Sequence, residues 1–335
     1  MKARLGVALQ LATAAALAVG LPALLVHGDY GRHLLILTLI LGALAVSLNL
    51  VMGYAGLVSV AHGAFFGIGA YTTALMTVNG YPFIVSVIAG MLLAALTGTL
   101  LGVATLRLRG HYFAVATLAF TMVAVIILER WEEVTRGARG VANIPRPTPV
   151  SFGSVTLSFA DFWPMYVLLM CVVCLFVLVV HLVVHSPFGK SLLCIQRNEL
   201  LGKVYGVNVM WVKLRVLALS AAMASVSGSL YASYIAYVSP NDANFMRSFE
   251  AIMYVVVGGT GTNWGPLLGT VFVHILPELL RGFDNFRLLI LGGILVAVVR
   301  FYPAGLAGGI AEIVKFATRL RRLSSRFQRT KPVTD

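Results

Sequence analysis

Few side chains in this 335-residue sequence are able to do chemistry inside its long apolar stretches. The polar residues near the middle of those stretches are Asn49, Ser59, His62, Asn263 and His274. Polar groups at membrane depth are costly, and they usually serve a pathway or a hydrogen bond between helices. A pathway role is favoured for Asn49 and His62, because both flank a glycine-rich break. For His274 an interhelical hydrogen bond is at least as good an explanation.

Two glycine-rich interruptions accompany these polar residues. Gly63 and Gly67 follow the first interruption; Gly265 lies in the second, which runs through residues 258–266, and Gly269 follows it. In each pair the glycines are four residues apart, a spacing that lets helix backbones approach closely in lipid. Packing alone explains any one such pair. Two interrupted segments in opposite halves of a chain favour a translocation path between pseudo-repeats.

Other chemistry is weakly supported. Glu129, Glu250 and Glu278 fall near the ends of the expected spans, so an ion-coupled carrier lacks the buried carboxylate it usually needs. The pair Cys171-x-x-Cys174 has no second pair to complete a metal site. The stretch Gly189-Lys190-Ser191 lacks the earlier glycine of a phosphate-binding loop. We therefore predict no catalytic residue, no metal site and no cofactor in this chain.

The elements that must position these residues are membrane helices. Apolar residues make up 59% of the chain, charged residues 11%, and the mean hydropathy is +0.91. Such a composition excludes a soluble enzyme and a disordered chain. We expect an all-α polytopic membrane protein with about eight full spans and a short broken helical pair at 248–280. The eight expected spans cover residues 5–26, 34–52, 61–78, 84–106, 113–128, 162–184, 214–238 and 288–301.

Charge predicts the orientation of these spans. If residues 1–301 form the transmembrane domain with the N-terminus inside, the cytoplasmic segments carry most of the 25 lysines and arginines. Residues 129–161 then form an extracytoplasmic loop, and residues 302–335 form a basic cytoplasmic tail. For the tail to be cytoplasmic, the broken pair at 248–280 has to cross the membrane twice, or dip in and return to the same side. The net charge of +13 thus indicates topology and contact with anionic lipids, with no nucleic acid as a partner.

Residues 186–213 form the most informative cytoplasmic loop. Ser186 is a plausible helix N-cap, Pro187 suits the first helical position and Gly206 suits a helix end. Apolar and charged residues alternate between them, and Gly202 is a candidate break between two short helices. A surface of this kind needs either a protein partner or the lipid surface to cover its apolar side.

Several stretches together resemble the LivM-type permeases of branched-chain amino acid ABC importers, with urea and amide permeases as close relatives. They are Ser47–Gly56, Ser59–Tyr71, Arg107–Phe113, Ser186–Lys190, Gly206–Asn208 and Val257–Pro266. The similarity covers roughly residues 34–300. It implies an ABC importer permease fold with pseudo-repeat halves, located in the bacterial inner membrane with both termini cytoplasmic.

The resemblance also implies partners and roles. The partners are two ATP-binding subunits, which hold the ATP, a second homologous permease and an extracytoplasmic substrate-binding protein. Branched-chain amino acids are the expected substrates, with urea, short amides or another small solute as alternatives. An ATP-independent carrier or channel and a membrane enzyme are the rival hypotheses. The expected pathway residues are Asn49, Ser59, His62, Gly63, Gly67, Asn263, Gly265 and Gly269, and the expected ATPase-coupling residues are Pro187, Gly189, Arg197, Glu199, Gly206 and Asn208.

Overall fold

The computed structural model describes residues 28–108, 110–147, 150–152, 155–159, 161–280, 286–302 and 305–309. The first expected span, at residues 5–26, and the basic residues of the tail from Lys315 onward lie outside the described residues.

Helices dominate the described chain, which confirms the all-α polytopic fold class. The long ones are α2 (Asp29–Asn49), α4 (Phe83–Thr105), α5 (His111–Arg130), α7 (Phe162–His185) and α10 (Val209–Ile235). A π-helical turn, η1 (Leu50–Tyr54), extends α2. Shorter helices are α3 (His62–Val78), α6 (Glu132–Thr135), α8 (Pro187–Arg197), α9 (Glu199–Val204), α11 (Phe245–Gly258), α12 (Gly265–Leu279) and α13 (Arg287–Phe301), with 3-10 turns η2 (Gly137–Arg139) and η3 (Pro240–Ala243).

Five of the described helices are long and apolar enough to cross a membrane: α2 with η1, α4, α5, α7 and α10. The helix α3 has 17 residues, and α11, α12 and α13 have 14 or 15. At about 1.5 Å per residue these shorter helices extend only about 21–26 Å. The count of eight full spans therefore stays a prediction.

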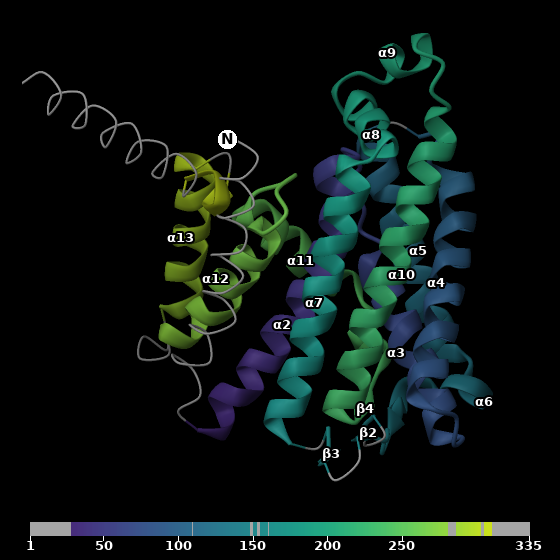
Figure 1. The fold of residues 1–335 in the computed structure, drawn as a ribbon, viewed down its shortest axis with the longest axis vertical. Coiled ribbons are helices and arrows are strands. Elements are labelled where there is room, and N and C mark those ends of the chain that lie inside the picture. The colour runs from purple at the N-terminus through teal and green to yellow at the C-terminus, as the bar shows by residue number, and fades with distance from the viewer. Residues whose placement is uncertain are drawn as a thin grey trace, which may run out of the picture.

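Figure 1 shows α8 and α9 at one end of the helical body, and α6, β2, β3 and β4 at the opposite end. The strands are short: β1 (Val141–Ala142) pairs antiparallel with β4 (Tyr237–Val238), and β2 (Val150–Phe152) with β3 (Val155–Leu157). The expected outer loop, 129–161, thus lies at the end away from α8 and α9 (Figure 1).

The helix α10 is the centre of the packing, with α2, α3 and α4 around it. Small residues make this possible. A Cβ atom on Gly228 would overlap the carbonyl of Phe66, and one on Gly69 would overlap the carbonyl of Ser225. Hydroxyls add interhelical bonds, such as Thr73 Oγ1 donating to Ser229 Oγ at 2.8 Å. Close approach through small residues is the usual means of helix association in lipid.

The start of α10 corrects the expected span of 214–238. The helix begins five residues earlier, because the side chain of Asn208 caps it by accepting from the Trp211 N–H at 3.2 Å. The helix ends at Ile235, and Tyr237 and Val238 belong to β4. Lys213 therefore lies within the helix and is only 8% exposed.

The broken segment enters and leaves from the same end of the body. It follows β4, and α12 returns along α2, where Thr38 Oγ1 lies 2.7 Å from His274 Nδ1. Tyr30, at the start of α2, donates to Glu278 near the end of α12 at 2.8 Å. Two short helices, α11 and α12, flank the break, as expected for a broken helical pair, and the number of membrane crossings stays a prediction. His274 makes the interhelical hydrogen bond considered for it.

We predict that Gly228→Leu destabilises the protein, whereas Gly292→Leu on α13 does not. A side chain at 228 meets the backbone of α3, but a Cβ at 292 meets no atom within 4 Å. Overpacking of this kind costs about 1–3 kcal/mol. Thermal unfolding of the purified variants in detergent measures the difference. Equal melting temperatures for the two variants would contradict the packing described for α3 and α10.

Candidate functional site

The first interruption, residues 55–61, is a stretch of non-helical backbone held by side chains of other helices. The Val60 N–H donates to Thr117 Oγ1 at 3.0 Å, and the Val60 carbonyl accepts from Thr121 Oγ1 at 2.8 Å. Ser248 on α11 donates to the same carbonyl at 2.6 Å and accepts from the Gly63 N–H at 2.7 Å. Irregular backbone at membrane depth is tolerated where the protein satisfies its polar groups in this way.

The second interruption, residues 259–264, is held in turn by Asn49 at the end of α2. The Asn49 side chain accepts from the Gly261 N–H at 2.9 Å and donates to the Thr262 carbonyl at 2.8 Å. Thr262 Oγ1 accepts from the Gly265 N–H at 3.1 Å at the start of α12. Each break is therefore braced by a residue from the helix that precedes the other break: Asn49 for the second and Ser248 for the first.

Asn263 joins this second break to two further helices. Tyr54 in η1 donates to Asn263 Oδ1 at 2.6 Å, and Asn263 Nδ2 lies 3.0 Å from Nδ1 of His181 on α7. Three segments far apart in sequence thus meet at one amide group. Asn49 and Asn263, both expected at the pathway, lie at the same break.

The glycine pairs serve as close-contact points. A Cβ on Gly67 would overlap Ala243, and one on Gly63 would overlap the carbonyl of Asn244. In the second pair, a Cβ on Gly269 would overlap the carbonyl of Tyr254, and one on Gly265 would overlap Thr262 Oγ1. Each expected pair therefore brings an interrupted segment against its neighbour, which is the packing function of such spacing.

The other two expected pathway residues are fully buried. Ser59 Oγ accepts from the Ala61 N–H at 3.3 Å within the first break. His62 Nε2 lies 2.7 Å from Ser220 Oγ, which donates to the Ser47 carbonyl at 2.6 Å. His62 thus ties the start of α3 to α10 and α2.

The loop expected at 186–213 contains α8, α9 and the first turn of α10. The side chain of Ser186 accepts from the Gly189 N–H at 3.2 Å, which confirms the cap, and Pro187 takes the first helical position. A Cβ on Gly189 would overlap the carbonyls of Val183 and Val184. Gly206 follows the end of α9 with φ +74°, a conformation that glycine accepts readily.

The expected break at Gly202 is wrong. The two helices separate at Asn198, whose side chain accepts from the N–H groups of Leu200 and Leu201 at 2.9 and 3.4 Å. Asn198 starts α9 because an asparagine oxygen satisfies the orphan N–H groups of a first helical turn. Gly202 lies inside α9, where a Cβ would be 3.1 Å from the Ile195 side chain, so the small residue lets α9 fold back on α8.

Glu199 has a partner within the chain. Its carboxylate lies 2.9 Å from Nζ of Lys213 on α10 and 3.9 Å from Nζ of Lys203. The Lys213 side chain is 10% exposed and that of Glu199 34% exposed, so this pair is partly shielded from water. The ion pair fastens α9 to the base of α10, while Arg197 is exposed at the end of α8.

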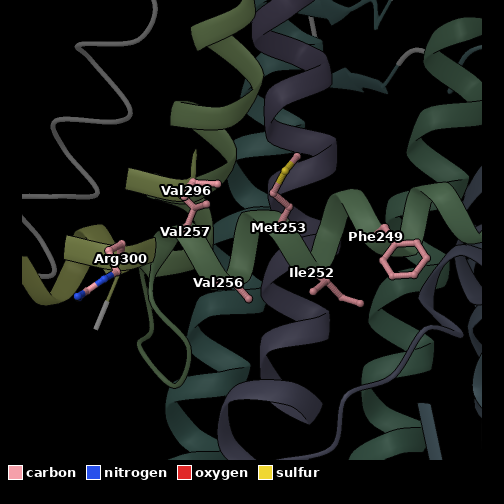
Figure 2. A pocket seen from close by; sticks show the side chains of 7 residues that line it. All are labelled: Phe249, Ile252, Met253, Val256, Val257, Val296 and Arg300. Carbon is pink, nitrogen blue, oxygen red and sulfur yellow. The ribbon is translucent and has the colours of Figure 1, made fainter. Parts of the chain in front are cut away.

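Two cavities are lined by residues outside the breaks. A polar one of about 280 Å³ opens at the end opposite α8 and α9, lined by Asp29, Arg32, His33, Arg146 and Asp161 together with apolar residues such as Ile36 and Met165. An apolar groove of about 800 Å³ lies between α11 and α13. Figure 2 shows Phe249, Ile252 and Val256 along α11, with Val296 and Arg300 on α13. This groove suits hydrocarbon, because among the described residues Arg300 is the single charged one in its lining.

The comparisons with known proteins agree with this architecture. A family described as the permease component of the branched-chain amino acid transport system matches residues 32–299. The chain belongs to this family. The permease is 32% identical over 289 residues to the high-affinity branched-chain amino acid transport system permease protein LivM of Escherichia coli K12, covering 81% of this chain and 68% of LivM.

Two more distant relatives belong to the same transport systems. A probable branched-chain amino acid transport permease LivM of Methanocaldococcus jannaschii is 25% identical, over 78% of this permease and 88% of that protein. The permease LivH of Salmonella typhimurium is 23% identical, over 79% of this chain and 90% of LivH. No solved structure matches the permease. Similarity to both LivM and LivH places the chain among multi-pass permeases that occur in paired forms.

Sequence reasoning missed several residues of the permease's two breaks. Ser248, Thr117 and Thr121 brace the first break, and Tyr54 and His181 contact the second. The one signal available was the spacing of Thr117 and Thr121, which puts two hydroxyls on one face of an apolar helix.

We predict that Ser248→Ala lowers the melting temperature of the permease more than Thr99→Ala. The serine accepts from the Gly63 N–H, and a buried N–H left without a partner costs about 1–3 kcal/mol. The Thr99 hydroxyl donates to the Ala95 carbonyl of its own helix. In an α-helix that carbonyl also accepts from the backbone N–H four residues later, so it keeps a partner when the hydroxyl is removed. Thermal unfolding in detergent compares the two. If Ser248→Ala unfolds no earlier than the control, the bracing of the first break does not depend on this hydroxyl.

Proposed function

We propose that this chain is a transmembrane subunit of an ABC importer that carries branched-chain amino acids across the bacterial inner membrane. Similarity to LivM over 81% of the chain is the observation that carries the substrate class. The permease itself does no covalent chemistry, and its energy comes from ATP hydrolysed by two partner subunits. A second permease related to LivH completes the path.

The face made by α8 and α9 supports docking on an ATPase. Leu200, Val204 and Tyr205 there are 66%, 81% and 78% exposed. They lie beside charged residues and outside the expected membrane spans, so lipid tails do not account for their exposure. An exposed apolar patch with a polar rim is the usual mark of a protein-binding surface. Pro187, Gly189, Gly206 and Asn208 shape this surface by starting and ending its helices, and Glu199 anchors it to α10.

The opposite end supports delivery of a zwitterionic solute by a binding protein. Its polar cavity has cationic and anionic side chains, Arg32 and Asp29 among them, and some apolar residues. A branched-chain amino acid has the matching parts: an ammonium group, a carboxylate and an apolar side chain. This end is then extracytoplasmic, and both termini are cytoplasmic.

Between these ends the two breaks are the proposed moving parts. The expected pathway residues at the first break are Ser59, His62, Gly63 and Gly67, and those at the second are Asn49, Asn263, Gly265 and Gly269. Non-helical backbone held by a few side chains changes shape at lower cost than a helix, whose backbone hydrogen bonds form a continuous ladder. ATP-driven closure of the partners would then rearrange these segments and alternate the access of the path.

Uptake by whole cells tests the substrate class. Cells with and without the gene are given labelled leucine, isoleucine, valine, urea and acetamide. We expect uptake of the three amino acids to depend on the gene and on ATP, and uptake of urea and acetamide to be independent of the gene. If only the uptake of urea or acetamide depends on the gene, that solute is the substrate and the amino acid assignment is wrong. Uptake that persists after ATP depletion would favour an ATP-independent carrier.

A charge swap tests the docking surface. We predict that Glu199→Lys lowers the amount of ATPase that co-purifies with the tagged permease, because the new lysine faces Lys213 and Lys203 and releases α9 from α10. The Lys213 ammonium is then left mostly buried without its carboxylate, which is more costly than losing an exposed ion pair.

The double variant Glu199→Lys with Lys213→Glu restores an opposite pair and should recover co-purification. Full retention of ATPase in the single variant would show that this pair does not position the docking surface. Loss in both variants would instead assign Glu199 a direct contact with the partner.

A further inference from the structure

One backbone residue, Gly53, contacts both the α8–α9 surface and the second break. Its carbonyl accepts a hydrogen bond from Nε2 of Gln196 on α8 at 2.7 Å. On its other side, a Cβ atom would overlap Asn49 Oδ1 and the amide nitrogen of Gly261. The residue has to be glycine because the second break lies against its Cα. Gln196 and Gly261 are therefore separated by a single residue.

The contacts continue into the break from both Gly53 and its neighbour. Asn49 Oδ1, which a side chain on Gly53 would displace, accepts from the Gly261 N–H at 2.9 Å. Tyr54, the next residue, donates to Asn263 Oδ1 at 2.6 Å. A shift of Gly53 thus displaces the break at two points, Gly261 and Asn263.

The local backbone is suited to such a shift. Gly53 lies in the π-helical turn η1, at the end of α2 and directly before the first break. A π-turn is a looser helical geometry that occurs mostly as single turns, and often at functional sites. From Leu34 to Asn49, α2 is almost wholly buried against other helices, so a shift of that part would disturb many contacts. Movement imposed by α8 is therefore confined to the end of α2.

We infer that Gln196 and Gly53 relay movement of α8 to the second break, with Gln196 as a positioning residue of the transport cycle. The inference rests on the proposed docking of α8 and α9 on an ATPase. It adds a defined route, Gln196 to Gly53 to Asn49 and Gly261, by which that movement reaches the path. Packed side chains and hydrogen bonds of this kind carry energetic coupling between distant sites, and variants along them test the route.

The test uses three variants that separate hydrogen-bond donation from size and polarity. Gln196→Glu keeps the shape but removes the donor, Gln196→Leu removes all polarity, and Gln196→Lys keeps a donor of similar reach. Ser191→Ala is the control on the same helix, since the Ser191 hydroxyl donates at 3.3 Å to the Pro187 carbonyl of α8 itself. The permease is purified with its co-purifying subunits and reconstituted in liposomes.

The measured quantity is labelled leucine taken up per ATP hydrolysed in the same vesicles. We expect Gln196→Glu and Gln196→Leu to lower this ratio by about fivefold or more, the lower range of allosteric coupling. ATP hydrolysis should continue, because the Glu199–Lys213 pair is intact. Gln196→Lys and Ser191→Ala should keep the wild-type ratio. A structural role would reduce the amount of complex without changing the ratio, and that result overturns the inference, as does a wild-type ratio in Gln196→Glu.

A second measurement does not depend on the solute. A fluorophore is attached at Thr260→Cys, an exposed position within the second break, after Cys171, Cys174 and Cys194 are replaced by alanine. Addition of ATP should change the fluorophore's emission in the labelled protein that keeps Gln196 and in its Gln196→Lys variant, but not in Gln196→Glu. An equal change in all three overturns the relay. If the unmodified complex contains no ATPase, the proposed function has failed, and this is seen at purification before any variant is compared.

Discussion

The structure depends on one constraint: backbone N–H and C=O groups inside a membrane have to be paired. Two segments of this permease leave the helical ladder, and each recovers its pairs from a side chain outside the break. Ser248 pairs with Val60 and Gly63 at the first break, and Asn49 pairs with Gly261 and Thr262 at the second. Because each brace comes from the helix before the other break, the two interruptions are structurally dependent on one another.

Close packing follows from the same constraint. A serine or asparagine side chain is short, so it reaches a foreign backbone only where the two segments nearly touch. Glycines supply that approach: Gly53 lies against Gly261, Gly63 against the Asn244 carbonyl, and Gly269 against Tyr254. The glycine-rich character of this permease is therefore a requirement of its hydrogen bonding as much as of its helix packing.

The α8–α9 region shows how two short helices are fixed to the end of a helical bundle. Its helices are too short to be stable alone, and three features hold them: the Ser186 cap, the Asn198 cap and the Glu199–Lys213 ion pair. These leave Leu200, Val204 and Tyr205 facing outward. This exposed face is the surface that we propose docks on an ATP-binding subunit.

Sequence alone determined the class of fold, the helices expected near 34–52, 61–78, 84–106, 113–128 and 162–184, the break at 258–266, and the helix-end roles of Ser186, Pro187 and Gly206, because these follow from hydropathy and local backbone preferences. It also identified Asn49 and Asn263 as unusual polar residues at membrane depth. Only the tertiary structure decided what they contact. Asn49 is 213 residues from Thr262, Gln196 is 143 from Gly53, and Ser248 is 188 from Val60. Local patterns report which residues are costly to bury, but the partner that offsets the cost is set by how distant helices pack.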